Sequence, residues 1–83
     1  MNTFQLTCFL AVAETLSFAR AAEQLHVTQP AVTQQIKSLE KELNVKLFRR
    51  NTRTVRMTMA GSAFLEDARH IVSLSRRAVK RFE

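Results

Sequence analysis

The chain contains few residues of the kinds that interrupt or cross-link a fold. Its 83 residues include one glycine, one proline and one cysteine, and they include neither tryptophan nor tyrosine. A lone cysteine excludes a disulfide within the chain and is typical of proteins in the reducing cytoplasm. Because Gly61 is the only glycine, a glycine-rich loop that cradles phosphates is also excluded. With so few helix breakers, we expect most residues to be helical.

Long apolar runs and clusters of metal ligands are missing as well. The longest fully apolar run, Cys8 to Ala13, is far too short to span a bilayer, and no signal peptide precedes it. We therefore expect a soluble, cytoplasmic protein that has no membrane partner. Cys8, His26 and His70 are too few and too scattered for a structural zinc site, so we expect no metal and no cofactor. Asp67 and His70 share a helix face, but no cleft-forming sequence surrounds them, which argues against an enzyme.

The charge of the chain is strongly positive and unevenly distributed. The formal net charge is +6, and the isoelectric point is about 10.8. Residues 1–36 contain one arginine and two glutamates, a sum of −1, whereas residues 37–83 contain twelve Lys or Arg and five acidic residues, a sum of +7. This balance favours a polyanionic partner such as nucleic acid over an anionic membrane surface. The length and the 46% apolar content support one small domain.

Apolar residues recur at helical spacing in the first 25 residues. The first helix is predicted from Thr3 to Thr15, and we expect its core-facing stripe to consist of Leu6, Phe9, Leu10 and Ala13. Cys8 lies in the same apolar pattern and is most simply a small buried side chain. Ser17 is predicted to cap a short second helix whose apolar face carries Phe18, Ala21, Ala22 and Leu25. These two helices can supply much of the core.

The third predicted helix begins with a polar first turn. The hydroxyl of Thr28 can cap it, and Pro30 lies where its missing N–H costs little. The helix is predicted to reach about Leu43, and Asn44 stands where a left-handed residue commonly ends a helix. One face is apolar and contains Val32, Ile36, Leu39 and Leu43. The opposite face is polar or basic and contains Pro30, Thr33, Gln34, Lys37 and Lys41.

A short hairpin is predicted after this helix. Two extended runs, Leu47 to Arg50 and Thr54 to Met57, are joined by a polar turn at residues 51–53. Apolar and polar residues alternate in the second run, so one side of this wing can pack while the other carries charge. Thr58 is predicted to cap a last helix that continues to about Phe82.

The last helix carries two apolar stripes, although packing on one small domain needs only one. One stripe can cover the core, and the other can pair with the same helix of a second chain. The candidate dimerisation residues are Phe64, Leu65, Ala68, Ile71, Val72, Ser75 and Val79. The alternative is a single amphipathic helix packed wholly on its own domain. The basic residues near its end most simply complement the negative end of the helix, and these are Arg76, Arg77, Lys80 and Arg81.

Many spaced positions of the chain form one family pattern. In the helical part they are Phe18, Arg20, Ala21, Ala22, residues 25–33, Gln35, Ile36, Leu39, Glu40 and Leu43. In the wing and beyond they are Leu47, Phe48, Arg50, Arg53, Val55, Thr58, Ala60 and Gly61. This pattern resembles the N-terminal domain of LysR-type transcriptional regulators over essentially the whole chain. Four positions depart mildly from it while keeping the local chemistry: Thr28 and Thr33 replace the common Ser, Asn44 the common Gly, and Met59 the common Pro.

The resemblance implies a mostly α fold with two parts. Residues 1–58 would form a winged helix-turn-helix with a three-helix core and a short two-stranded β wing, and residues 59–83 a long linker and dimerisation helix. The implied function is transcription regulation by sequence-specific binding of double-stranded DNA, as a dimer on an inverted-repeat operator. The third helix would enter the major groove, and the wing would reach the flanking minor groove or backbone. We expect the effector-sensing domain of the family, and with it any small-molecule effector, to be absent from this chain.

The residue chemistry of the third helix and the wing agrees with this implication. The candidate DNA-binding residues are Thr28, Gln29, Pro30, Thr33, Gln34, Lys37, Arg50 and Arg53. The Gln34 amide suits the adenine edge, and the Thr33 methyl suits a thymine methyl. Lys37 and Arg50 suit phosphates, whereas Arg53 at the wing tip could enter a narrow minor groove. The alternative for each of these is an ordinary solvated side chain.

Two other functions stay open at this point. A helical interaction module would use the last helix to pair with a partner protein and would bind DNA only weakly and without sequence preference. Single-stranded nucleic-acid binding needs exposed aromatic rings, but the six aromatic residues are all Phe and their spacing places most of them in the core.

Overall fold

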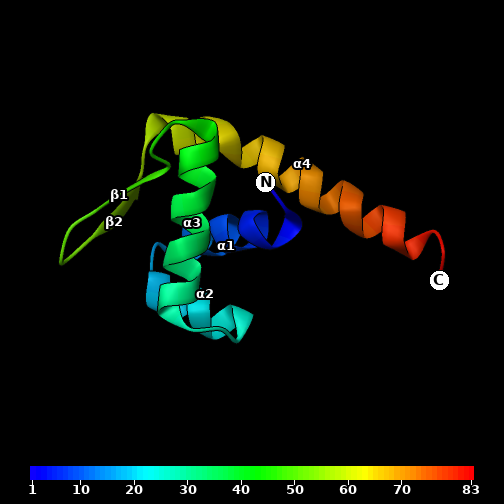
Figure 1. The fold of residues 1–83 in the computed structure, drawn as a ribbon, viewed down its shortest axis with the longest axis horizontal. Helices are drawn as coiled ribbons and strands as arrows, with labels where there is room; N and C mark the ends of the chain where they lie inside the picture. The colour runs from blue at the N-terminus through cyan, green and yellow to red at the C-terminus, as the bar shows by residue number, and fades with distance from the viewer.

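The computed structural model describes all 83 residues, and it is mostly helical as predicted (Figure 1). Three helices form the body, a two-stranded sheet projects from it, and a long fourth helix runs across it. The elements are α1 (Thr3–Thr15), α2 (Phe18–Leu25), α3 (Gln29–Leu43), β1 (Phe48–Arg50), β2 (Val55–Met57) and α4 (Met59–Lys80). This arrangement is a winged helix-turn-helix followed by a long helix, so the predicted fold class is confirmed.

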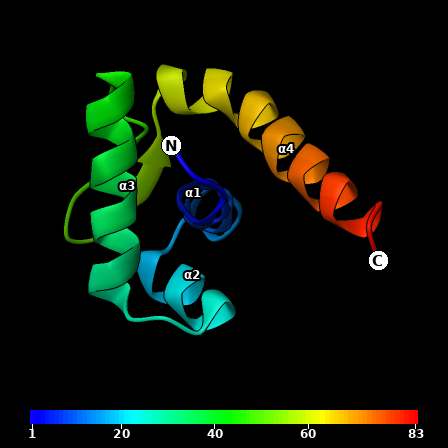
Figure 2. The same cartoon turned by 45° about the vertical axis from the view of Figure 1, so that its right-hand side comes forward.

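Helix α1 lies at the centre of the molecule. In Figure 2 it is seen nearly end-on, with α3 and α4 on either side and α2 below. Leu6 and Phe9 of the predicted stripe are fully buried, whereas Leu10 and Ala13 are only partly buried. The prediction of a single stripe was too narrow, because helices on several sides of α1 also bury Cys8, Ala11 and Val12. Burial raises the pKa of the Cys8 thiol, since an apolar environment disfavours the thiolate.

Helices α2 and α3 form the helix-turn-helix, and local caps set both of their starts. The Ser17 hydroxyl accepts a hydrogen bond from the Arg20 N–H at 3.1 Å, and the Thr28 hydroxyl accepts one from the Ala31 N–H at 3.2 Å. His26 ends α2 in the left-handed region, with φ 58°. Asn44 ends α3 in the same conformation, with φ 57°, as predicted. The core side of α3 buries Val32, Ile36 and Leu39, with Leu43 partly buried beside them.

The wing is a tight antiparallel hairpin. The register pairs Phe48 with Met57 and Arg50 with Val55. Each strand begins one residue later than predicted, because Leu47 and Thr54 lie outside the ladder. The turn is held by the Asn51 side chain, whose Oδ1 accepts hydrogen bonds from the N–H groups of residues 53 and 54 at 2.8 and 2.9 Å. The wing points away from the body on the side opposite the C-terminal end of α4 (Figure 1).

Helix α4 begins at a threonine cap and runs beyond the body. The Thr58 hydroxyl accepts a hydrogen bond from the Gly61 N–H at 2.9 Å, which confirms the predicted cap. The helix ends at Lys80, two residues before the predicted end at Phe82, and the chain finishes in a turn. It packs on α1 and buries Ala68 and Val72, while its C-terminal end extends past the other helices (Figure 1). No helix of the protein combines the length and the apolar character that crossing a membrane requires.

Candidate nucleic-acid interface

The outer side of α3 forms an open polar groove together with the end of β1. This side faces away from α1, and no other helix covers it (Figure 2). The groove is lined by Gln29, Pro30, Thr33, Gln34, Lys37, Ser38, Lys41 and Arg50. Six of the eight predicted DNA-binding residues therefore line one surface. Ser38 was missed by the sequence analysis, although its spacing of four from Gln34 places it on the same side of the helix.

The two remaining predicted residues lie outside this groove. Thr28 precedes the groove, and its hydroxyl is already engaged as the helix cap. Arg53 is exposed in the wing turn, away from the groove. Thr28 is the N-cap of α3, so Gln29 and Pro30 are the first two residues of the helix, and both are exposed. The unpaired N–H groups and the positive end of the helix dipole lie at that turn, which favours a negatively charged ligand.

The basic side chains around the groove are free of acidic partners. The salt bridges of the chain join the N-terminal amine to Glu42, Lys46 to Glu40, and Glu66 to its helix neighbours Arg69 and His70. None of them involves the basic residues of the groove and wing, which are Lys37, Lys41, Arg49, Arg50, Arg53 and Arg56. Their positive charge is therefore available to a polyanion.

A second, smaller niche of about 360 Å³ lies between α3 and β1. It shares Thr33, Lys37 and Arg50 with the groove, and it adds Lys46, which precedes β1, and Arg49 of β1. Its apolar lining comes from Phe18, Ile36 and Phe48. The niche therefore connects the outer side of α3 with the wing and carries a surplus of positive charge.

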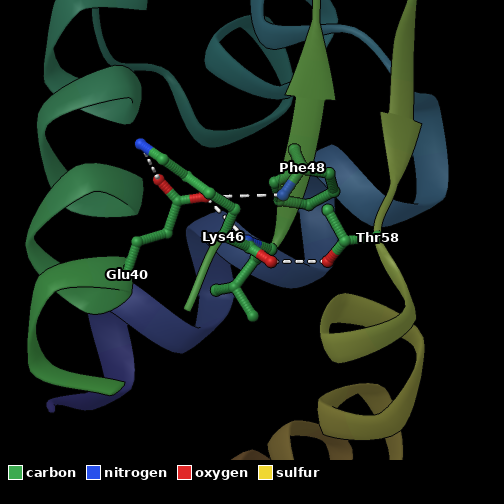
Figure 3. Close-up of polar contacts among 5 residues, drawn as sticks. Glu40, Lys46, Phe48 and Thr58 are labelled. Atoms are coloured by element: carbon green, nitrogen blue, oxygen red, sulfur yellow. Dashed lines mark hydrogen bonds and ion pairs between the residues drawn. The ribbon is translucent and has the colours of Figure 1, made fainter. Parts of the chain in front are cut away.

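A buried carboxylate fixes the wing to α3 (Figure 3). Glu40 Oε2 accepts hydrogen bonds from the backbone N–H groups of Leu47 at 2.7 Å and Phe48 at 3.4 Å. Lys46 Nζ lies 4.0 Å from the other carboxylate oxygen, and its mostly exposed side chain adds little stability. The sequence analysis gave Glu40 no role, because only the path of the chain from α3 into β1 brings these N–H groups to the carboxylate.

The start of α4 closes the same junction from the other side. The Thr58 hydroxyl donates to the Lys46 carbonyl (Figure 3). The Thr58 N–H donates to the Leu47 carbonyl at 3.0 Å. We call the set of Glu40, Lys46, Leu47, Phe48 and Thr58 the wing clasp. Through it, hydrogen bonds join α3, the residues that lead into β1 and the start of α4, and so hold the wing beside the groove.

The predicted dimerisation residues of α4 are divided between the core and the surface. Ala68 and Val72 are buried against the rest of this chain, and Phe64, Leu65 and Ser75 are partly buried. Ile71 and Val79 are 41% and 63% exposed, and Phe82, beyond the helix end, is 88% exposed. The structure also exposes 61% of Leu74, which belongs to neither predicted stripe and lies about 60° from Ile71 around the helix, on the side turned away from the core.

Comparison with known proteins identifies the chain's relatives. The family model described as bacterial regulatory helix-turn-helix protein, lysR family, matches residues 4–62. The HTH-type transcriptional regulator TfdT of Cupriavidus pinatubonensis is 44% identical over 98% of this chain, and ClcR of Pseudomonas putida is 48% identical over 100% of it. The matched regions are 36% and 30% of those relatives, so the chain spans about a third of their length.

Solved structures match the fold closely. The CbnR DNA-binding domain in complex with DNA has a TM-score of 0.93 and 48% identity, and the match covers 98% of this chain and 93% of that one. The BenM DNA-binding domain in complex with catB site 1 DNA has a TM-score of 0.91 and 35% identity, and the match covers 99% of this chain and 92% of that one. With the family model covering residues 4–62, these likenesses show that the chain belongs to the LysR family of bacterial helix-turn-helix regulatory proteins.

Proposed function

We propose that this chain binds double-stranded DNA with sequence preference and acts as the DNA-binding part of a bacterial transcription regulator in the cytoplasm. The observation that carries the proposal is the uncovered outer side of α3, where polar groups able to read bases lie beside unpaired basic residues. The family membership supports it, as do the DNA complexes of the CbnR and BenM domains with the same fold. In this proposal α3 enters the major groove, which is wide enough for a helix.

Base reading is assigned to the middle of the groove. Gln34 is exposed there, and its amide can both donate to and accept from an adenine edge. Thr33 lies beside it, half-buried, and can present its methyl group to a thymine. Gln29 and Pro30, at the exposed first turn, lie where helix N-termini of this class approach the bases and the backbone.

Backbone binding is assigned to the basic residues around the groove. Lys37 and Arg50 line it directly and carry no ion pair, so they can bind phosphates without losing an internal partner. Arg53 is exposed at the wing tip, where it can reach the flanking minor groove or backbone. These contacts raise affinity for every sequence and make binding depend on salt.

Two alanine variants separate these roles. Gln34→Ala is expected to cost about 1–3 kcal/mol on the preferred site and to relax selection at one base pair. Lys37→Ala, one turn along the same side of α3, is the matched control and should weaken all duplexes alike while lowering the salt slope by about one. Anisotropy titrations of both variants on the preferred and a scrambled duplex measure these effects. Equal losses on both duplexes for both variants would contradict the role of Gln34.

The proposal includes a homodimer formed through α4. Ile71, Ser75 and Ala78 fall within about 60° of one another around the helix, next to its core-facing side, and Phe82 follows just past the helix end. Ile71 and Phe82 are exposed, so this side offers apolar surface to a second copy of the helix. A two-fold dimer would present two copies of α3, and it would therefore match an inverted-repeat operator.

The dimer is tested by placing a charge on each side of α4. Ile71→Glu is expected to shift the chain towards monomer in sedimentation velocity, because it buries a carboxylate in the proposed apolar contact. Ser73→Glu is the matched control, since Ser73 is also exposed but lies about 160° from Ile71 around the helix. The proposal fails if the wild-type chain is a monomer at high concentration and on DNA, or if the two variants shift association equally.

A further inference from the structure

Arg50 is held against an aromatic ring at the edge of the niche between α3 and β1. Its guanidinium carbon lies 4.3 Å from the centroid of the Phe18 ring. That ring is fixed by the core, because Phe18 is only 5% exposed and meets the Phe48 ring edge-on at a centroid distance of 6.1 Å. The arginine is therefore exposed to solvent but rests on a rigid, buried surface.

The hydrogen-bond donors of Arg50 have no competing acid. No carboxylate lies within ion-pair distance of its guanidinium. The one acidic residue of the niche, Glu40, is already bound to the N–H groups of Leu47 and Phe48 and faces Lys46 with its other oxygen. An arginine fork in this state can bind two oxygens of a phosphate without breaking an internal ion pair.

We propose that Phe18 is a positioning residue, whose ring holds the Arg50 guanidinium at the junction of α3 and the wing so that a DNA backbone phosphate is bound in the niche. This inference rests on the proposed DNA-binding function, and Phe18 is not one of the predicted DNA-binding residues. A free arginine side chain would lose rotamer entropy on binding, whereas the stacked one is already ordered. The phosphate site joins the two DNA-contacting elements, because Lys37 on α3 and Arg49 on β1 line the same niche.

A double-mutant cycle tests the coupling between the two residues. The variants are Phe18→Leu, Arg50→Ala and the double variant, each titrated with a duplex at several salt concentrations. Arg50→Ala should weaken binding to specific and scrambled duplexes alike and lower the salt slope by about one. Phe18→Leu, which removes no charge, should weaken binding by about two- to fivefold, the usual size of an exposed cation–π contact. In the Arg50→Ala background, Phe18→Leu should have no further effect on affinity.

Loss of an aromatic ring also loosens the core, so a matched control is needed. Phe9→Leu removes a ring from the same core cluster, where Phe9 contacts Phe48 and Phe64 and does not touch Arg50. It should lower the melting temperature but leave the DNA affinity of the folded protein unchanged. Circular dichroism confirms folding of each variant, and Phe18→Met replaces Phe18→Leu if the latter does not fold, because methionine fills irregular gaps.

The outcomes separate this inference from the function on which it rests. If the wild-type chain binds no DNA, the proposed function itself is contradicted. If the wild-type chain binds DNA, two results would contradict this inference alone. One is an unchanged affinity in Arg50→Ala. The other is an equal loss of affinity from Phe18→Leu in the Arg50→Ala background and in the wild type. Loss of affinity in Phe9→Leu equal to that in Phe18→Leu also overturns it, because the effect would then come from the core as a whole.

Discussion

Gly61→Ala should destabilise the protein, although alanine is normally the better helix former. Gly61 lies in the first turn of α4, and a Cβ built on it would be 2.2 Å from the carbonyl oxygen of Leu47. The backbones of α4 and the wing entry would have to separate by roughly 1 Å to reach van der Waals contact. That oxygen accepts the Thr58 N–H of the wing clasp, so the separation also strains this hydrogen bond.

The magnitude follows from three opposing contributions. Overpacking of this kind costs about 1–3 kcal/mol, and a lost hydrogen bond costs about 1 kcal/mol. The higher helix propensity of alanine offsets up to about 1 kcal/mol of this loss in stability. We therefore expect Gly61→Ala to lower the free energy of unfolding by about 1–3 kcal/mol and the melting temperature by about 4–8 °C for each kcal/mol.

Thermal and urea unfolding followed by circular dichroism measure this loss. Ser62→Ala is the control, since Ser62 is exposed in the same turn and its truncation should change stability by no more than about 0.5 kcal/mol. A Gly61→Ala variant as stable as the wild type, or more stable, would refute the reasoning. It would mean that α4 can move away from Leu47 at little cost, and that the wing is not fixed by this junction.

Further measurements probe the wing clasp, the α3 cap and the buried cysteine. Glu40→Ala should lower the free energy of unfolding in urea by about 1–3 kcal/mol, because it leaves buried N–H groups unpaired. Glu40→Gln should lower it less, because the amide oxygen can still accept from the Leu47 N–H. Equal losses in the two variants would argue against a role for the hydrogen bonds of the carboxylate. Thr28→Ala removes the α3 cap and should lower stability by about 0.5–2 kcal/mol, whereas unchanged stability would show that the cap is dispensable. The Cys8 thiol should react with Ellman's reagent only as fast as the protein opens, because it is buried and its pKa is raised, and rapid labelling of the native protein would contradict this. Since the folded protein holds this proton more tightly than the unfolded chain, the Cys8 contribution to stability should decline as the pH rises above about 9, the ordinary pKa of the thiol.

Local signals in the sequence were sufficient for the starts of α2, α3 and α4 and for the end of α3. Ser17, Thr28 and Thr58 each cap the helix that they were predicted to cap, because a cap depends on a hydroxyl and an N–H three residues away. Asn44 takes the left-handed conformation for an equally local reason. The outer face of α3 could be predicted for the same reason, since helical periodicity alone separates it from the core side.

Features that depend on distant segments were not predicted. The burial of Val12 on a second side of α1 requires knowing that helices surround α1. The role of Glu40 and the need for glycine at position 61 both arise where the chain returns past Leu47, and no local pattern marks such a return. The stacking of Arg50 on Phe18 joins residues 32 positions apart and was equally invisible.

The most direct test of the central claim is the ratio of two dissociation constants. Binding sites are first selected from a randomised duplex library, and the enriched sequence is then compared with a scrambled duplex of equal length by fluorescence anisotropy. Our account predicts an enriched inverted repeat, two chains per duplex, and a preference for it that persists as the salt concentration is raised. No enriched sequence, or equal and steeply salt-dependent binding to both duplexes, would contradict it, because only attraction between a basic surface and a polyanion would then remain.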